Sequence, residues 1–90
     1  MNAPAGRVSV TGEVRHPGLY PVGRGLTLLA AIELAGGVTD FASVQHVRLL
    51  RNDAGTSRQI EIDLGRIGRG KALDILLQRD DRIQVPRRWR

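Results

Sequence analysis

Apolar and polar residues alternate between residues 8 and 22, with an interruption at Pro17-Gly18. The apolar positions of this stretch are Val8, Val10, Val14, Tyr20 and Val22. A period of two is typical of a strand with one buried face, and Pro-Gly favours a turn. The pattern therefore predicts a hairpin. Pro21 predicts an edge position for the second strand, because proline has no N–H to donate to a neighbour.

The same alternation returns twice later in the chain. Residues 47–51 and 60–64 flank the turn-rich cluster 52–56 and predict a second hairpin with a charged outer face. Residues 65–72 predict a loop or one short helical turn, and residues 73–77 form a short apolar segment. Ile83 and Val85 predict a last strand that Pro86 ends.

One segment has helical periodicity. Leu28, Ile32 and Ala35 recur at the spacing that places them on one helix face, after Thr27 as N-cap and before the helix-ending Gly36-Gly37. Two hairpins and a closing strand around one main helix predict an α+β fold. The order matches the β-grasp, a mixed sheet packed on a helix, in which the last strand lies centrally beside the first.

The composition limits the alternatives. The chain has 90 residues and a net charge of +5, and three of its arginines lie in the last four residues. We expect a lead-in at residues 1–7, one domain at 8–86 and a basic tail at 87–90. The absence of cysteine excludes disulfides and thiolate metal sites. No apolar run is long enough for a transmembrane helix, and the N-terminus does not resemble a signal peptide.

One sequence has the spacing of a phosphate-binding loop. Residues 65–71 fit G-x-x-x-x-G-K, but Ala72 replaces the hydroxyl residue that would hold Mg²⁺. A chain with one main helix also cannot form the doubly wound sheet that such loops require. The segment is therefore predicted to be a glycine-rich surface connection.

No other residue set predicts catalysis or metal binding. His16 and His46 lack helix-spaced partners and are expected to be surface or turn histidines, so no metal and no cofactor is expected. Asp80 and Asp81 are expected to be solvated turn carboxylates between Arg79 and Arg82. No serine or threonine has a His–Asp arrangement near it in the sequence. We therefore expect a binding or assembly module and no enzyme.

Three residues of the first hairpin are the candidate ligand contacts: Arg15, His16 and Tyr20. An exposed Tyr20 ring would stack on a sugar, although packing at the core or its rim is the preferred interpretation. The tail, with Trp89 among its arginines, predicts a free end or the start of a further domain.

Several segments together resemble a known family. The run from Val10 to Tyr20 resembles the opening V-x-G-x-V-x-x-P-G-x-Y of SLBB domains, the soluble-ligand-binding β-grasp family. Residues 27–37 resemble the family's helix and glycine stop, and residues 47–64 resemble its bacterial polysaccharide export branch. Residues 77–86 resemble its closing L-x-x-G-D-x-I-x-V-P, with Asp80 where glycine is usual, which we expect to alter the turn.

The resemblance implies a non-catalytic periplasmic domain of an outer-membrane polysaccharide export protein. Such domains pack against neighbouring subunits in homo-oligomeric rings, and polysaccharide is a further candidate partner. The chain shows neither the family's preceding export domain nor a lipid-anchor cysteine, so it is expected to be part of a longer protein. Two alternatives stay open. One is a saccharide-binding module acting alone, and the other is a DNA-binding SLBB domain like those of competence receptors. No nucleic acid partner is expected, so the DNA-binding alternative is the less favoured of the two.

Overall fold

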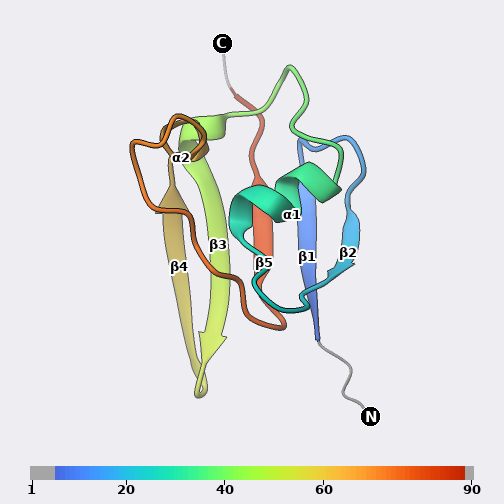
Figure 1. Ribbon diagram of the computed structural model, residues 1–90, viewed down its shortest axis with the longest axis vertical. Coiled ribbons are helices and arrows are strands. Elements are labelled where there is room, and N and C mark those ends of the chain that lie inside the picture. Colours follow the sequence, from blue (N-terminus) through green and yellow to red (C-terminus); the bar gives the residue numbers. More distant parts are fainter. Residues whose placement is uncertain (1–5, 89–90) are drawn as a thin grey trace.

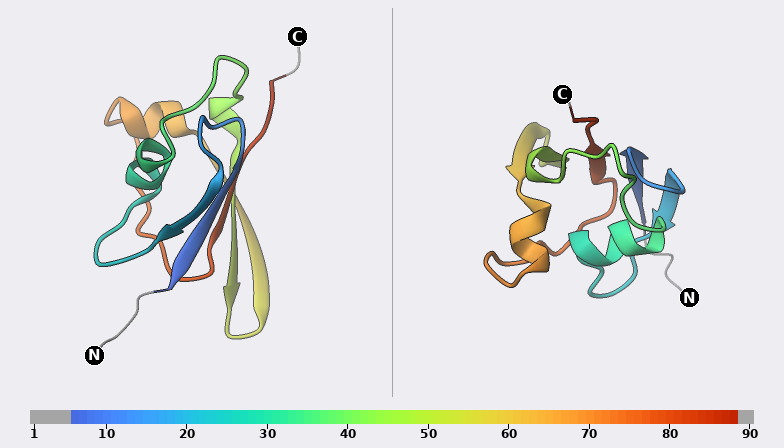
Figure 2. Two further views of the ribbon diagram at one scale, coloured as in Figure 1. Left: turned by 90° about the vertical axis from the view of Figure 1, so that its right-hand side faces the viewer. Right: turned by 90° about the horizontal axis from the view of Figure 1, so that it is seen from above.

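The computed structural model describes residues 6–88 and has one five-stranded mixed sheet. Its strands are β1 (Arg7–Gly12), β2 (Gly18–Pro21), β3 (Val47–Asp53), β4 (Thr56–Ile62) and β5 (Arg82–Val85). The helices are α1 (Leu28–Leu34), α2 (Leu64–Gly68) and the 3₁₀ turn η1 (Val44–His46). The two α-helices, α1 and α2, lie on the same face of the sheet, as Figures 1 and 2 show.

The strand order is β2-β1-β5-β3-β4. β1 and β5 are parallel, whereas the β1–β2, β3–β4 and β3–β5 pairs are antiparallel. The α+β, β-grasp-like prediction is therefore confirmed, including the central position of the last strand beside the first. β2 is an edge strand, as Pro21 predicted.

The core lies between the sheet and α1. It is aliphatic, and Leu28, Leu49, Ile83, Val8, Val10, Val47 and Val85 are its largest fully buried apolar side chains. The predicted helix face is confirmed, because Leu28, Ile32 and Ala35 are all buried. Thr27 caps α1 by accepting a hydrogen bond from the amide of Ala30 (3.2 Å), and Gly36 and Gly37 end it with φ of 86° and 87°.

Gly12 ends β1 earlier than the alternation predicted. Its φ is 90°, and a Cβ there would lie 2.1 Å from the carbonyl oxygen of Val85. Only glycine accepts both the left-handed conformation and this close approach of the neighbouring strand. Val14 therefore lies beyond β1, where it forms an isolated bridge with Val38.

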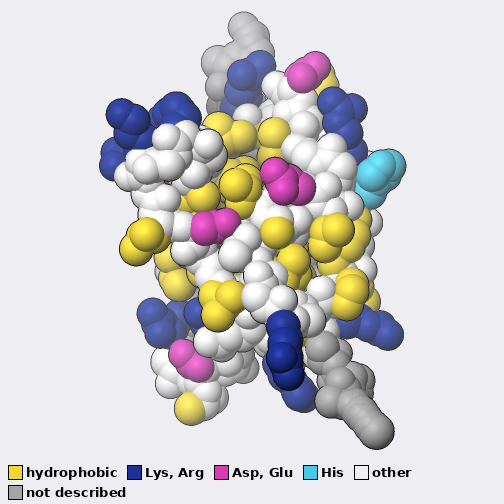
Figure 3. All heavy atoms as spheres, viewed as in Figure 1, with side chains coloured by type: hydrophobic (Ala, Val, Ile, Leu, Met, Phe, Trp, Pro, Cys, Tyr) yellow, Lys and Arg dark blue, Asp and Glu magenta, His cyan; other side chains and the backbone are white. Residues whose placement is uncertain are grey.

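The segment between α2 and β5 is less buried than its apolar residues suggest. Leu73 is 92% exposed and Leu76 is 61% exposed, whereas Leu77 is buried. The chain crosses beside α1 here, with an isolated bridge between Thr27 and Leu76. Figure 3 shows apolar side chains gathered on this helix-bearing face.

Candidate functional site

The three sequence-predicted contacts lie near the loop that joins β1 to β2. Arg15 and His16 are exposed, and their amides donate to the carbonyls of Gly37 and Ala35 (3.0 and 2.8 Å), which fixes the loop against the end of α1. The Tyr20 hydroxyl donates to the carbonyl of His16. The Tyr20 ring is half-buried and packs against the core, as the preferred interpretation expected. A ligand role for these residues stays a prediction.

The phosphate-loop spacing at residues 65–71 falls on the short helix α2 and the turn after it. The carboxylate of Asp63 caps α2 and accepts from the amide of Arg66 (3.1 Å). A carboxylate at that helix end repels phosphate and occupies the amide that a phosphate would need. The segment is the surface connection that the sequence predicted, and it includes the short helical turn.

Both histidines are exposed, as predicted. The structure nevertheless places Ser43 beside His46, with 3.0 Å from Oγ to Nδ1, and Glu61 on the other side of the ring. Sequence spacing does not reveal this cluster, because His46 lies in η1 whereas Glu61 comes from β4, the antiparallel neighbour of β3. The Nε2–Oε2 distance is 3.9 Å and both side chains are more than half exposed. That distance exceeds a hydrogen bond, so the geometry does not orient the ring for nucleophilic catalysis.

Asp81 corrects the expectation of solvated turn carboxylates. It is only 1% exposed and accepts two hydrogen bonds from Arg51, at 3.0 Å (Nε) and 2.7 Å (Nη2). The amide of Gln78 donates a third, at 2.8 Å. Sequence reasoning missed the pair because its partners lie 30 positions apart and Arg51 faces inward at the end of β3. Asp80 is exposed, as expected, and takes a left-handed conformation (φ 69°), which glycine adopts without strain.

The ion pair keeps Arg51 charged. Hydrogen bonding to Asp81 raises the pKa of Arg51 above its ordinary value, although burial opposes the shift. Arg51 Nη2 also donates to the carbonyl of Leu76 (3.0 Å). One guanidinium thus ties β3 to the start of β5 and to the segment before it, which fixes the backbone from which Arg82 projects.

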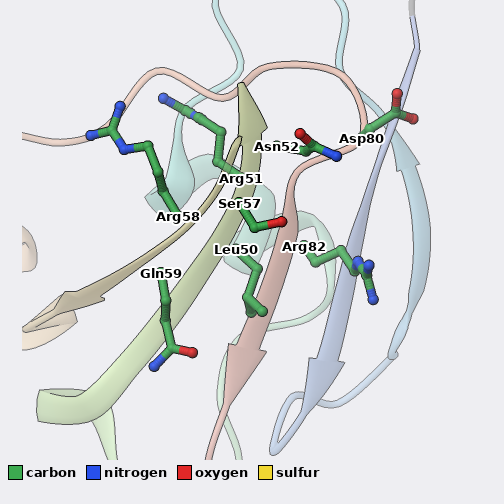
Figure 4. A pocket seen from close by; sticks show the side chains of 8 residues that line it. All are labelled: Leu50, Arg51, Asn52, Ser57, Arg58, Gln59, Asp80 and Arg82. Atoms are coloured by element: carbon green, nitrogen blue, oxygen red, sulfur yellow. The ribbon is translucent and has the colours of Figure 1, made fainter. Parts of the chain in front are cut away.

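The sheet has a second face, which no helix of residues 6–88 covers (Figure 2) and which we call the open sheet face. Its side chains come from the outward positions of all five strands: Leu19, Arg7, Ser9, Thr11, Arg82, Gln84, Arg48, Leu50, Asn52, Ser57, Gln59 and Glu61. Two shallow depressions lie here, with volumes of about 230 and 500 Å³, and both are lined by Asn52, Asp80 and Arg82. Figure 4 shows the lining of the smaller one.

A third depression lies at the other end of β5, between Arg48, Glu61 and the tail. Arg87 forms an isolated bridge with Ala42, and its guanidinium lies 4.6 Å from the centre of the Phe41 ring. The amide of Arg88 donates to the carbonyl of Phe41 (2.8 Å). These two tail residues are therefore attached to the domain. Residues 1–5 of the expected lead-in (residues 1–7) and residues 89–90 of the tail lie outside the described residues.

Two further properties concern residues 6–88 alone. Residues 6–88 include no group of three or more His, Asp or Glu side chains placed to hold a metal ion. None of the helices in this part of the chain has the length and apolar character needed to cross a membrane.

Comparison with known proteins places this architecture in a family. No curated protein matches the chain. The sequence model of the SLBB domain matches residues 7–61, which run from the start of β1 almost to the end of β4. SLBB domains are a ligand-binding, non-catalytic family, so the match indicates binding of a soluble ligand. Because the match covers more than half of the sequence, the chain belongs to the SLBB domain family.

Proposed function

We propose that this SLBB domain contacts a saccharide as a non-catalytic, periplasmic part of an outer-membrane polysaccharide export protein. The observation that carries the proposal is the open sheet face. It offers hydroxyls from Ser9 and Ser57, amides from Asn52 and Gln59, and apolar contact from Leu19 and Leu50. A sugar presents the complementary groups, hydroxyls that alternate with apolar C–H surface.

One stretch favours the export branch over the other members of the family. Residues 47–64 are the part by which the sequence resembles export proteins, and they run through β3 and β4 into the start of α2. Val47, Leu49, Ile62 and Leu64 of this stretch are buried in the core of the domain. In that setting, neighbouring subunits of a homo-oligomeric ring are the proposed partners, and the polymer passes beside the domain.

An in-frame deletion tests the export role. Residues 8–86 are removed from the encoded protein in a polysaccharide-producing host, and surface and intracellular polymer are measured separately. We expect surface polymer to be lost while polymer synthesis continues. The matched control is Arg24→Gln, an exposed arginine in the loop before α1, which leaves export unchanged. Normal surface polysaccharide after the deletion, with the shortened protein present at its usual level, contradicts the export role.

A stand-alone saccharide-binding module is the alternative. This alternative uses the same binding surface, the open sheet face, but under it polysaccharide export does not depend on the domain. Titration of the purified chain with oligosaccharides, together with the deletion, separates the two functions.

A further inference from the structure

The open sheet face has an ordered row of side chains across its strands. The registers place Ser9 opposite both Leu19 and Arg82, and Leu50 opposite both Arg82 and Gln59. Side chains at paired positions point to the same face of a sheet. The central row therefore reads, from edge to edge, Leu19, Ser9, Arg82, Leu50 and Gln59. One guanidinium stands in the middle, with an apolar and a polar group on each side of it.

A second guanidinium stands beside this row. Arg7 lies two residues before Ser9 on β1, so it points to the same face, and it lines the larger depression together with Arg82. Strand spacing and rise place the Cα atoms of Arg7 and Arg82 about 8 Å apart. Arg82 projects from β5 toward β1 in Figure 4. Two cations thus border one hollow.

These cations have no carboxylate partner among residues 6–88. The ion pairs in this part of the chain join Arg51 to Asp81, Arg58 to Asp53 and His46 to Glu61. Arg7 and Arg82 belong to none of them. Their charge is available to an anionic ligand, and a guanidinium binds a carboxylate through two parallel hydrogen bonds.

We propose that the open sheet face binds a carboxylated polysaccharide, a chain of uronic acid residues, that lies across the strands along the central row. The proposal rests on the proposed function and adds the class of saccharide and the residues that select it. Arg82 and Arg7 bind carboxylates, Ser9 and Gln59 bind hydroxyls, and Leu19 and Leu50 contact the C–H surface of the sugar rings.

The surroundings of the row favour a uronic acid chain over a denser polyanion. Asp80 borders the two depressions on one side, and Glu61 lies in the neighbouring row on the other. Both repel a polymer with closely spaced charges, such as polyphosphate or DNA. A uronate chain, with one carboxylate per sugar, can place its charges on the arginines and its neutral groups between them.

The site is also held in place before a ligand arrives. Asp81 precedes Arg82, and its side chain is held by Arg51 while its carbonyl accepts from the amide of Ser9 (2.9 Å). A fixed backbone lowers the ordering cost of binding. Arg51 and Asp81 act here as positioning residues and do not touch the ligand.

Calorimetric titration at low salt tests the proposal, with the purified chain and a galacturonic acid hexasaccharide. The matched probe is its methyl ester, which keeps the sugar rings and loses the charge. We expect the acid to bind and the ester to bind at least about tenfold more weakly. Arg82→Gln and Arg7→Gln should each weaken binding of the acid about tenfold, because each removes charge-assisted hydrogen bonds. Arg24→Gln removes the same charge elsewhere and should leave binding unchanged.

Four outcomes overturn the inference. If the ester binds as tightly as the acid, the ligand is a neutral saccharide, and the proposed function survives. If polyphosphate or duplex DNA binds more tightly than the hexasaccharide, the surface is a general anion site. If amide chemical shifts move at Arg15, His16 and Tyr20 and not at Ser9, Leu50 and Gln59, the ligand binds at the loop between β1 and β2 and not on the open sheet face. Absence of binding by either sugar contradicts the inference together with the saccharide contact of the proposed function.

Discussion

Asparagine in place of Asp81 tests the buried ion pair without leaving a cavity. The carboxylate is 1% exposed and accepts from Arg51 Nε, Arg51 Nη2 and the Gln78 amide, at 3.0, 2.7 and 2.8 Å. Asp81→Asn removes the carboxylate charge from all three hydrogen bonds. It also places the NH₂ group of the amide against one N–H donor, for example Arg51 Nε. Arg51 stays protonated in the variant, because a guanidinium does not lose its proton at any pH at which a protein is folded.

The expected loss of stability is large for a domain of this size. Removing one partner of a buried pair costs about 3–5 kcal/mol. We take about 3 kcal/mol because the amide oxygen, placed where Oδ2 stands, still accepts from Arg51 Nη2 and the Gln78 amide. A domain of 90 residues has a total stability of roughly 5–13 kcal/mol. The midpoint of thermal unfolding should fall by roughly 12–24 °C, at about 4–8 °C per kcal/mol.

Far-UV circular dichroism during thermal and urea unfolding measures the change. Asp80→Asn is the matched control, since it alters the exposed neighbouring carboxylate and should change stability by less than about 0.5 kcal/mol. In a cycle with Arg51→Gln, the double variant should lose less stability than the sum of the single variants, because both disrupt one interaction. Equal losses for Asp81→Asn and Asp80→Asn would refute the assignment of Asp81 as the buried partner of Arg51.

The remaining predictions concern backbone conformation and helix capping, and the same unfolding assay measures them. Asp80→Gly should raise stability by about 0.5–1 kcal/mol, since glycine adopts the positive φ of 69° without strain; a loss contradicts this. Gly12→Ala should cost more than about 2 kcal/mol because its Cβ would lie 2.1 Å from Val85 O, whereas Gly55→Ala, with open space around it, should cost less. Thr27→Ala should cost about 1 kcal/mol through loss of the N-cap of α1, with Thr56→Ala in β4 as a control expected to cost less.

Local chemistry determined much of the fold before any tertiary contact was known. Alternating valines, the Thr27 cap and the Gly36-Gly37 stop each depend on neighbours within a few positions, so the strands and α1 were predicted near their observed places. The order of these elements was sufficient for the β-grasp prediction, whereas the family was identified from motifs such as that of residues 10–20. The apolar character of residues 73–77 did not predict their burial, because an apolar run does not reveal whether another part of the chain covers it. Leu73 is almost fully exposed.

The candidate site depended on contacts that sequence spacing does not contain. Asp81 and its exposed neighbour Asp80 look alike in the sequence, and only Arg51, 30 positions away, makes Asp81 a buried residue. The row on the open sheet face brings together side chains from five strands, because the parallel pairing of β1 with β5 sets Ser9 beside Arg82. The sequence by itself determined which residues alternate inward and outward. Only the tertiary structure decided which outward residues meet, because strand order and register are set by long-range packing.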